Sequence, residues 1–261
     1  MNVLDWTKMK KNKTPISMVT CYDYWSAKIL SKTSVDCLLV GDSLAMVMYG
    51  YPDTLKADVS MMVKHVEAVR RGSPTQFIIA DLPFLSFRKG LLPAMEAAGE
   101  LMQAGANALK LEGVYGHEEI IKHMVLSGIP MMGHLGLTPQ SYHQLGGFKV
   151  QGKKANNSES IIHQAKLLEE LGTFAVVLEC IDEETANEIS EKLTIPTIGI
   201  GAGKGTDGQV LVLHDLIGAN SDFLPRFVRK YSSISETVLD AVNRFDQDVK
   251  GKVFPNKEET Y

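Results

Sequence analysis

The chain has 261 residues, of which 44% are hydrophobic and 22% are charged, and its formal net charge is -4. This length suits one α/β barrel, and the composition is that of a globular protein with an ordinary core, which excludes disordered and fibrous classes. The slightly acidic balance provides no basic surface for nucleic acid, and no apolar run approaches the ~18 residues of a membrane span. We therefore expect a cytoplasmic protein that binds neither nucleic acid nor membrane.

Short apolar runs bounded by turn residues alternate with longer segments of helical spacing, which is typical of parallel strands joined by crossover helices. The predicted strands are Ile16–Cys21, Cys37–Gly41, Phe77–Asp81, Ala108–Glu112, Pro130–His134, Phe174–Glu179, Thr197–Gly201 and Gln209–Leu213. They favour an α/β fold of the closed (β/α)8 TIM barrel type over an open doubly wound sheet. No G-x-G-x-x-G motif opens a helix after the first strand, which weakens a dinucleotide-binding alternative.

Helix signals fill the segments between these strands. Asp58 is a candidate N-cap for a helix over Val59–Arg71, and Pro93 suits the first turn of a helix over Leu92–Gln103. Further helices are predicted over Ser158–Leu171, Glu183–Leu193 and Ile234–Phe245. Because no Pro-rich or low-complexity linker interrupts the pattern, we expect one catalytic domain over residues 1–261, with a short N-terminal arm and a C-terminal helix and tail.

Polar residues stand at the predicted carboxyl end of nearly every strand. They are Tyr22, Asp23, Asp42, Ser43, Asp81, Lys110, Glu112, His134, Glu179, His214 and Asp215. Barrel active sites lie at this end, so these side chains are expected to converge over one pocket, although each acid alone could instead cap the next helix. Lys110 and Glu112 are two residues apart on a strand and therefore share a face, which should look inward.

Three separated carboxylates indicate a metal site. Asp42, Asp81 and Glu112 offer hard oxygen ligands, and no Cys/His cluster suggests zinc, so Mg²⁺ is the expected ion. Such an ion keeps positions open for a substrate carboxylate and the adjacent carbonyl oxygen, which indicates enolate chemistry on a 2-oxo acid. Lys110 could neutralise the substrate carboxylate or the enolate oxygen, or it could pair with Glu112 for structure.

Two further strand-end residues are candidates for contact with the substrate. Glu179 follows apolar residues in F-A-V-V-L-E-C, and such surroundings disfavour the charged form of a carboxylate, so Glu179 is the predicted base. His134, in G-H-L-G-L-T-P-Q-S, could donate a hydrogen bond to the substrate or be a structural histidine.

We expect the cysteines and the histidines of the predicted helices to have structural and not catalytic roles. The cysteines are odd in number and widely spaced, which favours reduced core thiols over a disulfide or zinc framework; they are Cys21, Cys37 and Cys180. The histidines in predicted helices stand at no ligand spacing and are expected on solvated faces; they are His65, His117, His123 and His163.

Long motifs cover nearly the whole chain. They are T-C-Y-D-Y at Thr20–Tyr24, L-L-V-G-D-S-L at Leu38–Leu44, A-D-L-P-F at Ala80–Phe84, A-G-A-N-A-L-K-L-E-G at Ala104–Gly113, G-H-L-G-L-T-P-Q-S at Gly133–Ser141, G-G-F-K-V-Q-G at Gly146–Gly152 and I-P-T-I-G-I-G-A-G at Ile195–Gly203. In these motifs the chain resembles the ketopantoate hydroxymethyltransferase (3-methyl-2-oxobutanoate hydroxymethyltransferase) family.

This resemblance implies a barrel of the phosphoenolpyruvate/pyruvate type. It implies transfer of a hydroxymethyl group from 5,10-methylenetetrahydrofolate to 3-methyl-2-oxobutanoate through a Mg-stabilised enolate, forming 2-dehydropantoate (ketopantoate) in pantothenate biosynthesis. With one Mg²⁺ per subunit, the family's metal ligands fall on Asp42, Asp81 and Glu112. Its substrate contacts fall on Asp42, Ser43, Asp81 and Lys110, and its proton acceptor falls on Glu179. The resemblance also implies a cytosolic decamer, so a homo-oligomer is expected.

Two other functions compete with this one. The same carboxylates suit a Mg-dependent C–C lyase acting on a 2-oxo acid, although such a lyase would usually need a reactive cysteine in a mobile loop. A non-catalytic barrel that binds a keto acid would be favoured by loss of a metal-binding acid, and none of the three is missing.

Overall fold

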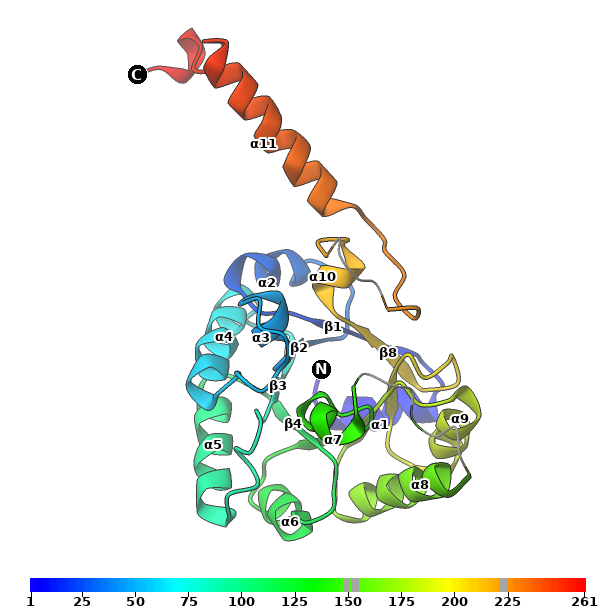
Figure 1. Ribbon diagram of the computed structural model, residues 1–261. Coiled ribbons are helices and arrows are strands. Elements are labelled where there is room, and N and C mark those ends of the chain that lie inside the picture. The colour runs from blue at the N-terminus through cyan, green and yellow to red at the C-terminus, as the bar shows by residue number, and fades with distance from the viewer. Residues whose placement is uncertain (148–150, 152–154, 221–224) are drawn as a thin grey trace. The chain divides into compact units, whose positions relative to one another are not determined.

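Eight parallel strands close into a barrel within the described residues of the computed structural model, which are 1–147, 151, 155–220 and 225–261. The strands are β1 (Ile16–Thr20), β2 (Cys37–Val40), β3 (Phe77–Asp81), β4 (Ala108–Glu112), β5 (Met131–Gly136), β6 (Ala175–Glu179), β7 (Thr197–Ile200) and β8 (Gly208–Leu211). Each strand pairs with the next in chain order, and β8 pairs with β1 (Figure 1). The predicted (β/α)8 TIM barrel is confirmed.

In the described part of the chain, helices alternate with the strands except between β7 and β8, where residues 201–207 contain no helix. They are α1 (Val3–Lys11), α2 (Tyr24–Leu30), α3 (Leu44–Val47), α4 (Val59–Gly72), α5 (Leu91–Gln103), α6 (Glu118–Leu126), α7 (Tyr142–Leu145), α8 (Ala155–Glu170), α9 (Glu183–Lys192), α10 (Leu213–Leu216) and α11 (Ile234–Lys250), with short 3-10 helices at Pro139–Ser141 and Lys257–Glu259. The predicted N-cap is confirmed, because the Asp58 side chain accepts the Met61 N–H at 2.7 Å.

Six of the eight predicted strands differ from the structure by one or two residues at one or both ends, and the fifth and the eighth differ most. The fifth continues to Gly136 because Leu135 and Gly136 still pair with β6. The eighth ends at Leu211, before α10 begins at Leu213. The motif Gly146–Gly152 lies partly outside the described residues, at 148–150 and 152.

Helix α1 closes the amino-terminal end of the barrel, where the sequence predicted only an arm. The Trp6 side chain is fully buried, and its ring lies 5.3 Å from that of Phe174 and 5.9 Å from that of Phe77 between ring centroids. Phe77 begins β3, and Phe174 directly precedes β6. This end is therefore packed with aromatic side chains, and the buried charged groups lie at the opposite end.

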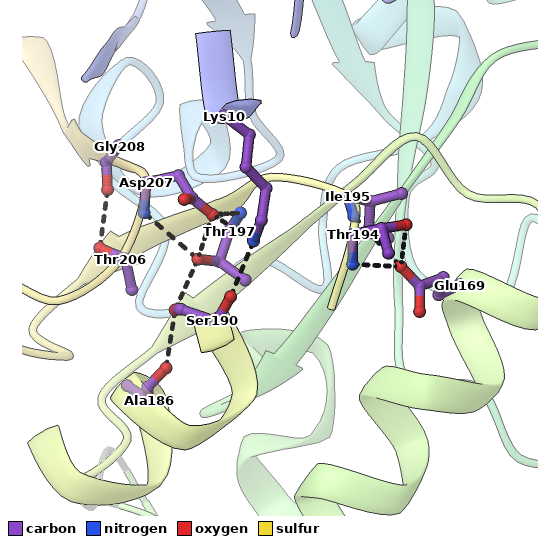
Figure 2. A network of polar contacts seen from close by, with 10 residues as sticks. All are labelled: Lys10, Glu169, Ala186, Ser190, Thr194, Ile195, Thr197, Thr206, Asp207 and Gly208. Carbon is purple, nitrogen blue, oxygen red and sulfur yellow. Dashed lines mark hydrogen bonds and ion pairs between the residues drawn. The ribbon is translucent and has the colours of Figure 1, made fainter. Parts of the chain in front are cut away.

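A polar network fastens α1 to the starts of β7 and β8 (Figure 2). The Asp207 carboxylate accepts hydrogen bonds from Lys10 Nζ at 2.8 Å, from the Thr197 N–H at 2.8 Å and from Thr197 Oγ1 at 3.0 Å. Lys10 Nζ also donates to the Ser190 carbonyl of α9 at 2.8 Å. In (β/α)8 barrels the active site lies at the carboxyl ends of the strands, and residues at the opposite end contribute to stability, so we assign this network a structural role.

The chain forms two compact units, Met1–Leu211 and Val212–Tyr261. The barrel lies within the first, and the second contains α10 and α11. A single catalytic domain over residues 1–261 stays a prediction. In the part of the chain that the structure describes, no helix is both long enough and apolar enough to span a bilayer.

The cysteines are buried as predicted, whereas one of the histidines expected on a solvated helix face is buried as well. Cys21, Cys37 and Cys180 are buried and free, as expected. The prediction for His117 is wrong, because this side chain is 2% exposed and packs edge-on against Phe87. His117 stands at the N-cap of α6, directly after the exposed residues Tyr115 and Gly116, and its burial comes from the contact with Phe87, which the helical pattern did not indicate.

Candidate active site

Six charged or titratable side chains meet at the carboxyl ends of five consecutive strands. They are Asp42, Asp81, Lys110, Glu112, His134 and Glu179. The strand register places them side by side, since Asp81 is paired with Lys110, Glu112 with His134, and Gly136 with Glu179. The inward direction expected for Lys110 and Glu112 agrees with their burial, at 5% and 3% exposure.

Lys110 pairs with Asp81, not with Glu112 as the structural alternative supposed. Its Nζ lies 3.0 Å from Asp81 Oδ1 and 3.3 Å from His134 Nδ1. Burial acts to lower the pKa of Lys110, but the negative charges of Asp81, Glu112 and Asp42 outweigh it and raise that pKa above its usual value. Lys110 is therefore a fixed positive charge inside the site.

His134 connects two carboxylates across the site. Its Nδ1 lies 3.4 Å from Glu112 Oε1, and its Nε2 lies 3.0 Å from Glu179 Oε2, an ion-pair contact without regular hydrogen-bond geometry. Burial and the charge of Lys110 lower the pKa of His134, but its contacts with the Glu112 and Glu179 carboxylates raise it to about 9. In these surroundings the ring carries both protons at neutral pH.

The three predicted metal ligands are nearly inaccessible to solvent. Asp42, Asp81 and Glu112 are 4%, 3% and 3% exposed, and the Asp42 N–H donates to Asp81 Oδ2 at 3.1 Å. Burial, followed by the charges of Asp81 and Glu112, raises the pKa of Asp42 well above its ordinary range. These acids therefore repel one another in a setting where water cannot screen them.

The donor set can be tested for its fit to a divalent cation. Among the described residues, no three histidine, cysteine, aspartate or glutamate side chains already form a cluster close enough to hold a metal ion. The charge balance nevertheless suits a divalent cation, because the carboxylates outnumber the two positive side chains beside them, Lys110 and His134. Asp81 Oδ1 is also buried without a hydrogen bond, and its ion pair with Lys110 is the contact that it makes. Hard oxygen donors of this kind suit Mg²⁺.

The Ser43 hydroxyl is positioned by a hydrogen bond with a buried tyrosine. Its Oγ lies 2.7 Å from the hydroxyl of Tyr22, which is fully buried, and it does not cap α3. Asp23 does not join the site, because its carboxylate caps α2 by accepting the Ser26 N–H at 2.9 Å. For Asp23 the capping alternative was right. His214 and Asp215 belong to the second unit.

Gln140 is a site residue that the sequence prediction missed. It follows β5 in the motif G-H-L-G-L-T-P-Q-S, is 7% exposed, and hydrogen-bonds both Asp42 and Glu112. The available signal was a polar residue in the turn after a barrel strand, but glutamine in a turn is usually solvated.

Solved structures of low sequence identity share this fold. The structure is similar to 2,3-dimethylmalate lyase, a member of the PEP mutase/isocitrate lyase superfamily, with a TM-score of 0.63 and 13% identity over 99% of this chain and 88% of that one. It is also similar to a phosphonopyruvate hydrolase in complex with oxalate and Mg²⁺, with a TM-score of 0.63 and 10% identity over 99% and 93%. These similarities agree with the closed (β/α)8 barrel that the strand pairing shows.

Close relatives identify the family. The chain is 55% identical to a 3-methyl-2-oxobutanoate hydroxymethyltransferase of Coxiella burnetii (strain Dugway 5J108-111) over 99% of this chain and 97% of the relative. It is 51% identical to the enzyme of that name from Bdellovibrio bacteriovorus, over 99% and 98%. The family model described as ketopantoate hydroxymethyltransferase matches residues 1–257. The resemblance seen in the motifs is confirmed: the chain is an enzyme that belongs to the ketopantoate hydroxymethyltransferase family.

Proposed function

We propose that this enzyme transfers a hydroxymethyl group from 5,10-methylenetetrahydrofolate to 3-methyl-2-oxobutanoate, forming 2-dehydropantoate in pantothenate biosynthesis. The family supports the class of reaction. The arrangement of a base, a fixed cation and three buried acids at one end of the barrel supports removal of a proton next to a keto group as its first step.

Glu179 is the proposed base that removes the C3 proton, and its accessibility carries this proposal. Its side chain is 19% exposed, whereas those of Asp81 and Glu112 are 5% and 3% exposed, so it is the acid that a substrate can reach. The protonated His134 ring lies 3.0 Å from Glu179 Oε2, which orients the carboxylate and leaves its other oxygen available for the C3 proton.

The remaining polar groups are proposed to hold the substrate and one Mg²⁺ per subunit. Asp42, Asp81 and Glu112 would hold the ion, which when bound supplies positive charge beside the keto oxygen and lowers the cost of losing the C3 proton. Lys110 neutralises negative charge on the substrate. Ser43 donates a hydrogen bond to the substrate, with its hydroxyl positioned by Tyr22. Asp42, Asp81 and His134 complete the substrate contacts.

A lyase of the competing kind needs a reactive thiol, and none of the three cysteines among the described residues has the properties of one. Burial raises the pKa of Cys21 to about 11 and that of Cys180 to about 12, and it raises the pKa of Cys37 as well. Thiols with such pKa values stay protonated near neutral pH and are poor acids and nucleophiles. This supports the transferase over a lyase that depends on cysteine.

Location and assembly are also proposed. Three free, buried cysteines support a reducing compartment, for which we propose the cytoplasm. A homo-oligomer, specifically the decamer implied by the family, is supported by an apolar stripe on α11. Val238, Val242, Phe245 and Val249 are spaced along one side of this helix, and an apolar stripe of this kind needs a surface to pack against. Sedimentation velocity of the full chain tests this proposal.

Proton exchange isolates the proposed first step. The wild-type protein is incubated with 3-methyl-2-oxobutanoate in D₂O, with and without Mg²⁺ and without folate, and NMR follows the C3 proton signal. We expect metal-dependent loss of that signal, because removal of the proton needs the base and the cation but no acceptor. The Glu179→Gln variant should still bind the substrate, with exchange abolished.

Glu184→Gln is the matched control. Glu184 is an exposed acid in α9, beyond the same strand, and its variant should exchange as the wild type does. Wild-type protein that fails to exchange at any metal concentration would overturn the enolate step, and the transferase proposal with it. Exchange by Glu179→Gln at the wild-type rate would overturn only the assignment of the base.

A further inference from the structure

Gln140 lies in the turn that follows β5, inside the 3-10 helix Pro139–Ser141. Its side chain is 7% exposed, although the neighbouring residues Ser141, Tyr142 and His143 are partly or fully exposed. A glutamine loses both hydration and rotamer freedom when it is buried, so such a side chain must be held by specific hydrogen bonds.

Its hydrogen bonds reach three different strands. The Gln140 backbone N–H donates to Glu112 Oε2 at 3.0 Å. The side-chain amide Nε2 donates to Asp42 Oδ2 at 2.8 Å and to the Leu82 carbonyl at 3.0 Å. A carbonyl oxygen can only accept, so the Leu82 contact determines which end of the amide carries the N–H groups. One residue from the β5 turn thus binds the ends of β2, β3 and β4.

The turn that carries Gln140 is itself held close to β6. Gly136 has φ of +95°, and a Cβ at this position would lie 2.2 Å from the Glu179 carbonyl oxygen, so the close approach requires glycine. The next residue, Leu137, donates its N–H to that same carbonyl at 2.8 Å. The turn therefore has a fixed origin beside the proposed base, and Gln140 extends from it to the acids.

We propose that Gln140 is a positioning residue that sets the affinity of the site for its divalent cation. Asp42 and Glu112 are both buried carboxylates that face the same residue, so their negative charges repel each other where water cannot screen them. By donating to one oxygen of each, Gln140 opposes their separation and restricts the rotation of both carboxylates, which leaves Asp42 Oδ1 for the ion. This inference rests on the proposed Mg²⁺ site. Partners of this kind, which bind the ligands and not the metal, typically change metal affinity 10–100-fold.

The test replaces the amide and retains the backbone contact. Gln140→Met has a side chain of similar length that cannot donate, so it loses the bonds to Asp42 and Leu82 while the N–H to Glu112 remains. Gln144→Ala is the matched control, because Gln144 is an exposed glutamine in the adjacent helix α7. Binding of Mn²⁺ to each purified protein is measured by electron paramagnetic resonance of the free ion. We expect the Kd of Gln140→Met to rise about tenfold or more, with Gln144→Ala unchanged.

The dependence of the proton-exchange rate on Mg²⁺ concentration distinguishes a positioning role of Gln140 from a general structural role. Gln140→Met should need more Mg²⁺ for half-maximal exchange and approach the wild-type rate once the site is saturated, since every proposed reacting group remains. A loss of rate that is the same at all metal concentrations would instead indicate a structural role and overturn the proposal.

Two further outcomes are distinguishable. Wild-type affinity for Mn²⁺ in folded Gln140→Met would overturn the role of Gln140 and leave the proposed function standing. Failure of the wild-type protein to bind Mn²⁺ would overturn the proposed metal site itself. Should Gln140→Met not fold, Gln140→Asn keeps an amide that is one methylene too short to reach Asp42 from the same backbone, and wild-type affinity in that variant would equally refute the proposal.

Discussion

The raised pKa of His134 predicts a pH-dependent loss of stability in the metal-free protein. Below the pKa of an unfolded histidine, 6.5, both states carry the proton and the stabilising contacts with Glu112 and Glu179 are fully present. As pH rises from 6.5 toward about 9, the folded state keeps a proton that the unfolded state has released, so stability falls. The two pKa values correspond to a loss on the order of 3 kcal/mol.

Urea unfolding in the presence of a chelator, at pH 6 and pH 9.5, measures this loss. The variant His134→Gln lacks the titrating ring, so its free energy of unfolding should fall by about 3 kcal/mol less than that of the wild type over this interval. The buried thiols Cys21, Cys37 and Cys180 also destabilise the folded state at high pH, but both proteins contain them, so the difference between the proteins reports His134. An equal fall in both proteins would refute the reasoning.

Asp207→Ala should lower the free energy of unfolding by about 2–3 kcal/mol, because the Thr197 N–H loses its acceptor and Lys10 loses its ion-pair partner and keeps only the Ser190 carbonyl. Denaturant titration measures this loss, and a variant of unaltered stability would contradict the structural role of the network. Tyr22→Phe should raise the KM for 3-methyl-2-oxobutanoate roughly threefold to tenfold with little change in kcat, because it removes the partner that positions the Ser43 hydroxyl. Steady-state kinetics decide this point, and a lowered kcat at constant KM would place Ser43 in the chemical step instead.

Local sequence was sufficient to predict the barrel and the end at which the site lies. Apolar runs alternating with helical segments indicated the strands, and the polar residue that ends each run marked the carboxyl ends that a parallel barrel must bring together. The residue types were informative for the same reason. Asp42, Asp81 and Glu112 offer hard oxygen ligands at the ends of apolar strands, and for that reason the sequence predicted a metal site there.

The partner of each side chain was decided by the tertiary structure. Lys110 and Glu112 share a strand face, but the register between β3 and β4 places Lys110 opposite Asp81, and the two form the ion pair. The burial of His117 and of Trp6 depends on segments distant in the sequence, Phe87 for the first and Phe77 and Phe174 for the second.

Gln140 shows why residue types could be interpreted from the sequence whereas contacts between side chains could not. In the sequence it is a polar residue in a turn, and nothing in its neighbours indicates burial. Its role appears only when barrel closure brings a residue after β5 to carboxylates that lie 28 and 98 positions earlier in the chain. Residue type and periodicity are local properties and determined the frame and its chemistry, whereas hydrogen-bond partners depend on the register and closure of the whole barrel, which only the folded chain provides.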